Sequence, residues 1–463
     1  MIALAIALLA LAGAAHAVPA QVERGFVAAT GGAITPPDVQ GAVGDAHVAI
    51  MLNGRWAVFD KQSGAPLVSA SLADFWSAAG VASPNGPFDP RLLYDASSRR
   101  WFATAANAAF LPNQILLAVS NGEDPTGGWT GFAIDADASD QTWADFPMLG
   151  VDDEGVYVAV PMYAFADDDQ VAAVDVLVVP KLDLVGPAPS VAGGTIFQLL
   201  APSAVGPVPQ PVVALDGGGL PLPLVSGVAA TPGAISIAHV AGTIDAPSVS
   251  PLATIAVDAY EPPPRAAQPG PKAALETSFG DLRSTASVVR RGGSLWAVQG
   301  VALGARAAVR WLELDAATGA LRQEGVLSDP ELHLFFPSIA VNEHEQVVVG
   351  MSGSSASTFA SAFAAVGERV GEAIEFGPLL LVREGLADYE RVRGGRNRWG
   401  DYSATVVDPA DARTFWTFQE FVAATDVWGV AAAAIRVPEP HAAALALVSA
   451  LALGALRRVR CAR

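Results

Sequence analysis

The stretch Pro90-Arg91-Leu92-Leu93-Tyr94-Asp95 decides the fold of this chain, because related stretches recur along the sequence. Most copies open with proline or a small residue, continue with mostly apolar residues and end at Asp or Asn. The copies lie at Gln40–Asp45, Pro90–Asp95, Pro147–Asp152, Pro211–Asp216, Thr285–Arg290, Pro337–Asn342 and Ser403–Asp408. Proline can open a strand, and Asp or Asn can start a turn by accepting hydrogen bonds from nearby backbone. Each copy therefore predicts a short strand followed by a tight turn.

A second apolar run follows the copies after a few turn-forming residues, as at 101–105, 156–160 and 414–418. These runs are about four to six residues long and rich in Val, Ile, Phe and Trp, which favours strands over helices. Further strand-like sequence follows, for example at 174–179 and 309–314. Each repeat therefore predicts a small antiparallel sheet.

The copies begin near residues 40, 90, 147, 211, 285, 337 and 403. A four-stranded propeller blade needs about 40–50 residues plus loops, and the spacing of the copies fits that length. We therefore expect an all-β fold, a β-propeller with seven blades. A β-helix would need much shorter repeats. A pair of β-sandwiches could share the strands but would not give a repeat around the whole ring.

The first residues have the pattern of a secretory signal peptide. Ile2–Leu11 is apolar, and the small residues Ala15 and Ala17 flank His16, which predicts cleavage after Ala17. No Lys or Arg precedes the apolar segment, so one common element of such signals is missing. We expect residues 1–17 to be removed.

The last residues combine Val437-Pro438-Glu439-Pro440, the apolar run Ala442–Leu456, and arginines that include Arg457 and Arg458. Prolines disfavour a helix in the first part, and the arginines favour a cytoplasmic location for the end. This arrangement resembles the PEP-CTERM sorting signal of exported bacterial proteins. The resemblance implies a transient transmembrane helix, and cleavage near Pro438–Pro440 by an exosortase-type membrane protease.

A permanent tail anchor is the alternative, but a run of about fifteen apolar residues is shorter than the roughly 20 that span a bilayer. The expected organisation is a signal peptide (1–17), a propeller-like domain (18–436) and a sorting signal (437–463). The expected partners are the Sec translocon, signal peptidase, the exosortase and exopolysaccharide. The expected location is the inner membrane transiently, then the cell surface or the extracellular space.

Composition narrows the function further. The formal net charge is -19 and the isoelectric point is near 4.6, so the surface repels phosphate backbones and nucleic-acid binding is excluded. The charge is compatible with cations and neutral glycans. The single cysteine, Cys461, lies in the sorting signal, so residues 18–436 contain neither a disulfide nor a thiolate metal site.

Two segments share the pattern Trp, small residue, Asp, aromatic residue: Trp143–Phe146 and Trp399–Tyr402. Phe88-Asp89-Pro90 is a partial third copy. In a propeller these segments begin innermost strands at one mouth of the central channel. Their carboxylates, Asp89, Asp145 and Asp401, would there hold a cation or sugar hydroxyls, with Trp143 and Trp399 as stacking surfaces. The alternative is that each Asp caps a turn and each Trp packs between blades.

Two acidic segments, one with Asp135, Asp137 and Asp140 and the other at 167–169, suggest calcium as a cofactor. The first segment lacks the sixth-position Gly and the twelfth-position acid of an EF-hand loop. Solvated turns would explain both segments equally well.

The segment Ser120–Trp129 resembles the Asp-box turn of sialidase-type propellers, in which the motif has a structural role. A sialidase would also need three arginines around a carboxylate, for which Arg91, Arg283 and Arg398 are candidates. The stretches 124–157 and 397–404 resemble uncharacterised secreted bacterial propeller proteins, a resemblance that implies no activity.

The sequence contains no nucleophile elbow, zincin motif, phosphate loop or dinucleotide fingerprint, so no catalytic residue can be named. We therefore favour a non-enzymatic surface or matrix protein that binds polysaccharide or another exported protein. The alternative is a secreted glycan-active hydrolase or lyase with its site at the channel mouth.

Overall fold

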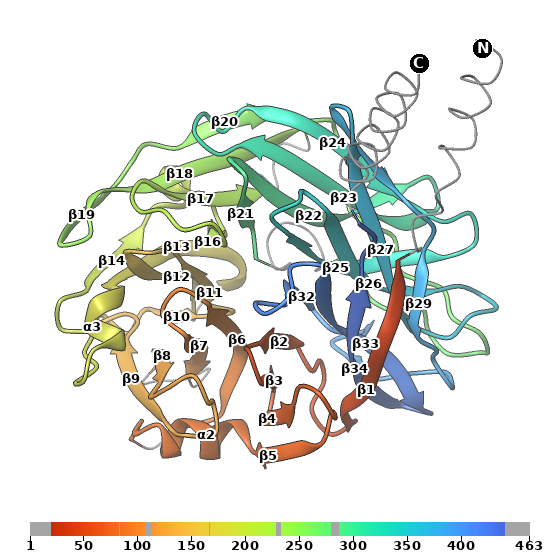
Figure 1. Ribbon diagram of the computed structural model, residues 1–463, viewed down its shortest axis with the longest axis horizontal. Helices are drawn as coiled ribbons and strands as arrows, with labels where there is room; N and C mark the ends of the chain where they lie inside the picture. Colours follow the sequence, from red (N-terminus) through yellow and green to blue (C-terminus); the bar gives the residue numbers. More distant parts are fainter. Residues whose placement is uncertain are drawn as a thin grey trace, which may run out of the picture.

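The structure is a computed structural model that describes residues 20–82, 84–107, 113–165, 167–227, 233–278 and 287–439. Mostly antiparallel sheets surround a central axis (Figure 1). The predicted all-β propeller fold is therefore confirmed.

Five sheets of four or five strands are separate blades. The first contains β2 (Gln40–Val43), β3 (His47–Leu52), β4 (Arg55–Asp60) and β5 (Pro66–Ala70). The second contains β6 (Pro87–Asp95), β7 (Arg100–Asn107), β8 (Gln114–Ser120) and β9 (Trp129–Asp135). Another contains β15 (Gln210–Pro211), β17 (Leu222–Gly227), β18 (Ala234–Thr243), β19 (Ala246–Val249) and β20 (Ala253–Ala256).

The remaining two separate blades come from the last part of the chain. One contains β25 (His333–Val341), β26 (Val347–Ser354), β27 (Ser361–Val370), β28 (Ala373–Phe376) and β29 (Leu380–Arg383). The other contains β32 (Ala404–Val407), β33 (Thr414–Ala424), β34 (Val427–Arg436) and β1 (Gln21–Gly31). Because β1 pairs antiparallel with β34, the two ends of the described chain close the ring.

A ten-stranded sheet completes the ring. Its strands are β10 (Thr142–Ala144), β11 (Met148–Val151), β12 (Gly155–Ala164), β13 (Asp167–Pro180), β14 (Thr195–Leu200), β16 (Val213–Ala214), β21 (Val289–Arg291), β22 (Ser294–Leu303), β23 (Arg306–Asp315) and β24 (Leu321–Leu327). Outside the blades lie the two-stranded ribbon of β30 (Val392–Arg393) and β31 (Arg396–Asn397), and the short helices α2 (Leu72–Ala78), α3 (Lys181–Val185) and α4 (Pro202–Val205).

The predicted count of seven separate blades needs correction, because the hydrogen bonding gives five separate blades and one larger sheet. The cause is β16, which is parallel to strands on both of its sides. Val213 pairs with Val151 of β11 and with Val289 of β21. The copy at Pro211–Asp216 thus contributes to two sheets. Pro211 pairs within its own blade, whereas Val213 pairs with the strands on either side of it.

The repeat nevertheless marks the strands nearest the axis. Neighbouring inner strands contact one another in the order β2, β6, β11, β16, β21, β25 and β32, and β32 contacts β2. The predicted copies coincide with or overlap these strands, so the interpretation of the copies as repeated strand modules is confirmed.

Apolar side chains from neighbouring blades form the core between them. Trp416 and Phe418 of β33 are fully buried in one such cluster with Val43 of β2. Gly41 leaves room for this packing, because a Cβ atom there would lie 2.3 Å from the Phe418 ring. Close packing between blades, rather than covalent cross-links, therefore holds the ring together.

Among the described residues no helix has the length and apolar character needed to cross a bilayer. The predicted signal peptide, with Ala15 and Ala17, lies outside the described residues. So do the predicted sorting helix, Pro440, Arg457 and Arg458.

Candidate functional site

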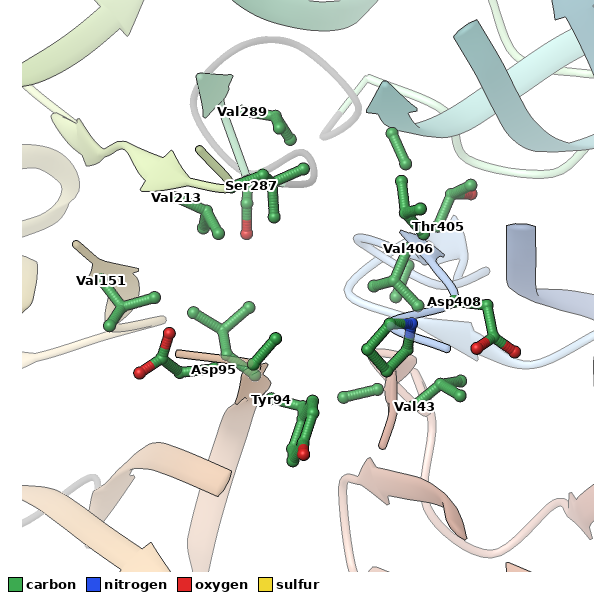
Figure 2. A pocket seen from close by; sticks show the side chains of 18 of the residues that line it. Val43, Tyr94, Asp95, Val151, Val213, Ser287, Val289, Thr405, Val406 and Asp408 are labelled. Carbon is green, nitrogen blue, oxygen red and sulfur yellow. The ribbon is translucent and has the colours of Figure 1, made fainter. Parts of the chain in front are cut away.

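The inner strands surround a central cavity of about 430 Å³. Figure 2 shows Val43, Val151, Val213, Val289 and Val406 placed around its open centre. This volume lies within the range of small-molecule sites. The cavity walls combine valines of the inner strands with polar and charged residues such as Asp95, Thr405 and Asp408.

The ends of the inner strands provide charged groups at one mouth of the channel. Asp95 and Asp408 lie there, and lysines compensate both of them. Lys181 Nζ is 3.0 Å from Asp95 Oδ2, and Lys61 Nζ is 2.6 Å from Asp408 Oδ1. Two of the three lysines in the chain thus pair with these two aspartates.

Four aspartates gather where the inner strands begin, and we call this end the acidic mouth. Asp38 precedes β2, Asp89 lies near the start of β6, Asp145 precedes β11 and Asp401 precedes β32. The structure therefore brings together the three predicted residues Asp89, Asp145 and Asp401, and it adds Asp38. The cavity reaches Gln40 and Ser403, two residues from Asp38 and Asp401.

Hydrogen bonds hold these carboxyl groups close together. Asn53 Nδ2 donates to Asp38 Oδ2 at 2.6 Å and to Asp89 Oδ1 at 3.3 Å. The Asp401 amide donates to Asp38 Oδ1 at 3.0 Å. The carboxyls of Asp38 and Asp145 each lie within hydrogen-bond reach of the Asp89 carboxyl. Two carboxyls at this separation can form a hydrogen bond when one of them carries a proton.

The backbone at the acidic mouth has an unusual conformation. Asp38 and Asp89 have φ of 49° and 51°, and Phe146, which follows Asp145, has φ of 29°. Positive φ is uncommon for residues other than glycine and has an energetic cost. The register of β6 against β7 also shifts between Phe88 and Arg91, which marks a bulge. Bulges and left-handed residues redirect the chain, here at the positions that carry the carboxylates.

Burial and mutual repulsion perturb the acids. Burial, with the charges of Asp401 and Asp89, raises the pKa of Asp38 well above its usual range. Burial and the Asp89 charge raise the pKa of Asp145 in the same way. Burial raises the pKa of Asp401 to about 6, although the Arg398 guanidinium opposes this rise. Arg398 Nη2 is 2.6 Å from Asp401 Oδ2.

Arg91 and Tyr402 form a buried pair beside the acids. The Arg91 guanidinium carbon lies 3.8 Å from the centroid of the Tyr402 ring, and Arg91 Nη2 donates to Met148 Sδ at 3.0 Å. Tyr402 is 2% exposed, and its hydroxyl has no hydrogen-bond partner. Burial and the charges of Asp89 and Asp38 raise the pKa of Tyr402, so the hydroxyl keeps its proton.

The two predicted tryptophans differ in their surroundings. Trp399 is 1% exposed, packs edge-on against Tyr389 with ring centroids 5.0 Å apart, and donates from Nε1 to Ser352 Oγ at 3.1 Å. It is a core residue, so the predicted stacking surface at Trp399 is wrong. Trp143 is half-buried, with its ring 5.6 Å from that of Tyr163. Of these two tryptophans, only Trp143 has a ring that a ligand can contact.

Hydrogen bonds within its own turn account for Asp137 of the first acidic segment. Asp137 accepts hydrogen bonds from Ser139 at Oδ1 and from Gln141 and Thr142 at Oδ2, so both oxygens are used within the turn. The segment at 167–169 begins strand β13, and its side chains lie outside the described part of the structure. Across the described ranges, no three or more His, Cys, Asp or Glu side chains are placed so that they could hold a metal ion.

The segment Ser120–Trp129 joins β8 to β9 and has the structural role that its resemblance implies. Trp129 Nε1 donates to the Pro125 carbonyl at 2.9 Å, and Asp124 Oδ1 accepts from the Thr126 amide at 2.8 Å. Of the three candidate arginines, Arg91 and Arg398 lie at the acidic mouth, and Arg283 lies outside the described residues.

Comparisons with known proteins add little beyond the fold. No protein-family model matches the chain, and no curated protein matches it. Solved structures that resemble it include extracellular domains 1–2 of Drosophila Semaphorin 1b, at 8% identity and a TM-score of 0.42, covering 90% of this chain and 88% of that one.

Two further similar structures are named after enzymes. A Penicillium chrysogenum alpha-L-arabinanase complexed with arabinobiose shares 9% identity at a TM-score of 0.37, covering 91% of this chain and 98% of the other. A subtype N10 neuraminidase-like protein (A/little yellow-shouldered bat/Guatemala) shares 10% identity at a TM-score of 0.37, covering 75% and 99%. No functional residue is transferred from these structures.

Proposed function

We propose that this protein is an exported surface or extracellular-matrix propeller that binds polysaccharide at its acidic mouth. The observation that carries the proposal is the cluster of Asp38, Asp89, Asp145 and Asp401, with the unpartnered hydroxyl of Tyr402 beside Asp38, Asp89 and Asp401. Another exported protein is the second class of ligand that such a scaffold would suit.

The chemistry of the acidic mouth suits a polyhydroxylated ligand. A protonated carboxyl donates a hydrogen bond and an ionised one accepts it, so neighbouring acids that differ in protonation can pair with adjacent sugar hydroxyls. The Tyr402 hydroxyl offers another donor. Trp143, two residues before Asp145, is half-buried and provides an aromatic face of the kind on which sugar rings stack.

Export and sorting belong to the same proposal. The Sec translocon would export the chain, signal peptidase would cleave after Ala17, and an exosortase-type protease would cleave near Pro438–Pro440. Val437 is buried, and its amide donates to the Arg413 carbonyl at 2.9 Å, so a cut beyond Val437 would leave the last blade intact. Mass spectrometry of the chain recovered outside the cell should find an N-terminus at Val18 and no peptide from 442–456. Recovery of intact termini would contradict the processing.

We also infer that the ten-stranded sheet acts as two blades joined by β16, which gives the ring seven radial units. The order of contacts among the inner strands supports this inference. Its consequence is that the units carrying Asp38, Asp89 and Asp145 are consecutive around the channel, with the unit of Asp401 next to that of Asp38. All four carboxyls would then come from one arc of the ring.

Binding of an oligosaccharide panel to the purified protein tests the function. Asp145→Asn should weaken binding to the best ligand by about tenfold, which corresponds to about 1.4 kcal/mol. Asp153→Asn is the matched control, because Asp153 lies at the opposite mouth and its carboxylate only accepts the Gly218 amide. Loss of affinity in both variants, or no binding to any glycan, would refute a glycan site at the acidic mouth.

A glycan-active hydrolase is the second candidate, and one observation favours it. Burial and the Asp89 charge raise the pKa of Asp145, while Asp401 is paired with Arg398, and acid-base hydrolysis of glycosides uses two carboxyls in such different environments. Product release from the same panel separates the two candidates. Cleavage by the wild type that disappears in Asp145→Asn would establish the hydrolase, whereas binding without products would favour the scaffold.

A further inference from the structure

Among the residues that the structure describes, the acidic mouth has more carboxyl groups than cations. Four aspartates meet there, and the ion pair formed within this group is Arg398 with Asp401. The Arg91 guanidinium lies over the Tyr402 ring, and it also interacts electrostatically with Asp89 and Asp38. The opposite mouth differs, because lysines compensate Asp95 and Asp408. At the acidic mouth the carboxyl groups are buried and outnumber the described cations, whereas Asp153 at the opposite mouth is exposed.

The close approach of the Asp38, Asp89 and Asp145 carboxyls is electrostatically unfavourable when all three are ionised, and a further cation would relieve the repulsion. Adjacent carboxylates repel, and burial together with this repulsion raises the pKa of Asp38 and of Asp145. An ammonium group has three donors and a positive charge, so it can replace protons on these acids and bond several carboxylates together. A neutral hydroxyl supplies no charge and leaves the repulsion in place.

A second, independent observation points to a ligand at this place. The Tyr402 hydroxyl is buried without a partner, and the charges of Asp89, Asp38 and Asp401 act on it, so it lies among the acids. Buried hydroxyls are nearly always hydrogen-bonded in folded proteins. A ligand with both an oxygen acceptor and a cationic donor would satisfy the hydroxyl and the carboxylates together.

From this geometry we infer that the acidic mouth selects polysaccharides with free amino groups, such as de-N-acetylated amino-sugar polymers. The inference rests on the proposed function and gives the chemical class of its ligand. The ammonium lies against Asp89 and Asp145, and a sugar oxygen accepts from the Tyr402 hydroxyl. Acetylation of the amine removes the charge and two of its donors. Anionic uronate polymers are repelled by the same carboxylates and by the net charge of -19.

Proton release accompanies this binding. The groups that face the site are Asp38, Asp89, Asp145, Asp401, Glu276, Glu420, Arg91, Arg398 and Tyr402. Protons on Asp38 and Asp145 leave when the ammonium arrives, because the cation favours the ionised acids. A neutral glycan that uses the same hydrogen bonds releases few protons.

Isothermal titration of the purified protein tests the inference, with three oligomers of equal length: glucosamine, N-acetylglucosamine and uronate. Near neutral pH, the glucosamine oligomer should bind at least about tenfold more tightly than the N-acetylated one, and the uronate oligomer should bind least. Repeating the titration in buffers of different ionisation enthalpy should show proton release for the free amine alone. Asp145→Asn should reduce the preference for the amine, while the control Asp153→Asn should keep it.

The outcomes distinguish this inference from the proposed function. If the N-acetylated oligomer binds as tightly as the free amine, selection for amines is wrong and glycan binding stands. If no oligomer binds, both are wrong. Comparison of the oligomers needs only the wild type, so the inference stays testable if Asp145→Asn does not fold.

Discussion

A buried carboxyl that is not one of the four clustered aspartates gives a quantitative test of the structure. Asp175 of β13 is fully buried; its Oδ1 accepts the Leu199 amide at 2.7 Å, while its Oδ2 has no partner. Burial raises the pKa of Asp175 from 3.8 to about 7. At about 1.4 kcal/mol per pKa unit, this rise corresponds to a free energy of about 4 kcal/mol.

The sign follows from proton binding. The folded protein holds this proton up to about pH 7, whereas the unfolded chain loses it near the ordinary value of 3.8. The stabilising contribution is therefore complete at low pH and is lost as the pH rises through about 7. Asp175→Asn keeps the Oδ1 acceptor and has no charge, so it should match the wild type at about pH 4 and exceed its stability by up to about 4 kcal/mol at about pH 8.

Denaturant unfolding at the two pH values measures this difference. The control is Asp245→Asn, because Asp245 is exposed in the turn between β18 and β19, and its substitution should have the same small effect at both pH values. A stability difference between Asp175→Asn and the wild type that does not change with pH would refute the buried, ionisable environment of Asp175.

Three further predictions concern packing and closure of the ring. Trp399→Phe should lower the free energy of unfolding by about 1–3 kcal/mol, measured by denaturant titration, because the bond to Ser352 Oγ is lost and a void remains; an unchanged midpoint would contradict a core role. Gly41→Ala should cost at least about 1–3 kcal/mol in the same measurement, because the new Cβ atom overlaps the Phe418 ring; a neutral effect would contradict the tight contact between blades. Removal of Gln21–Gly31 should lower the melting temperature, because β34 loses its antiparallel partner; an unchanged temperature would show that β1 does not close the ring.

The sequence predicts the repeated strands well because each copy combines local signals. Proline, a short apolar run and a turn-forming Asp act within six residues, and the copies fall on or overlap the inner strands. The same regularity predicts that Asp89, Asp145 and Asp401 lie close together, because equivalent positions in the blades of a propeller lie at the same end of its central channel. The sequence does not predict the role of β16, because the copy at Pro211–Asp216 resembles the others and its division depends on contacts with β11 and β21.

Other features of the site depend on contacts between distant segments. Asp38 follows two prolines and lacks the aromatic neighbour that marks the other copies, so its place in the cluster comes from Asn53 and the Asp401 amide. Trp399 has the same motif as Trp143, but Tyr389 and Ser352 enclose its ring. Motif similarity therefore predicted where the strands begin and not which tryptophan a ligand can reach.

The most direct test is a structure of the protein crystallised with a saturating glucosamine oligomer. A sugar ammonium should lie within hydrogen-bond distance of the Asp89 or Asp145 carboxylate, and a sugar oxygen should lie within reach of the Tyr402 hydroxyl. An oligomer seated elsewhere on the propeller, with the Tyr402 hydroxyl still unpartnered, would show that the four aspartates are not a ligand site.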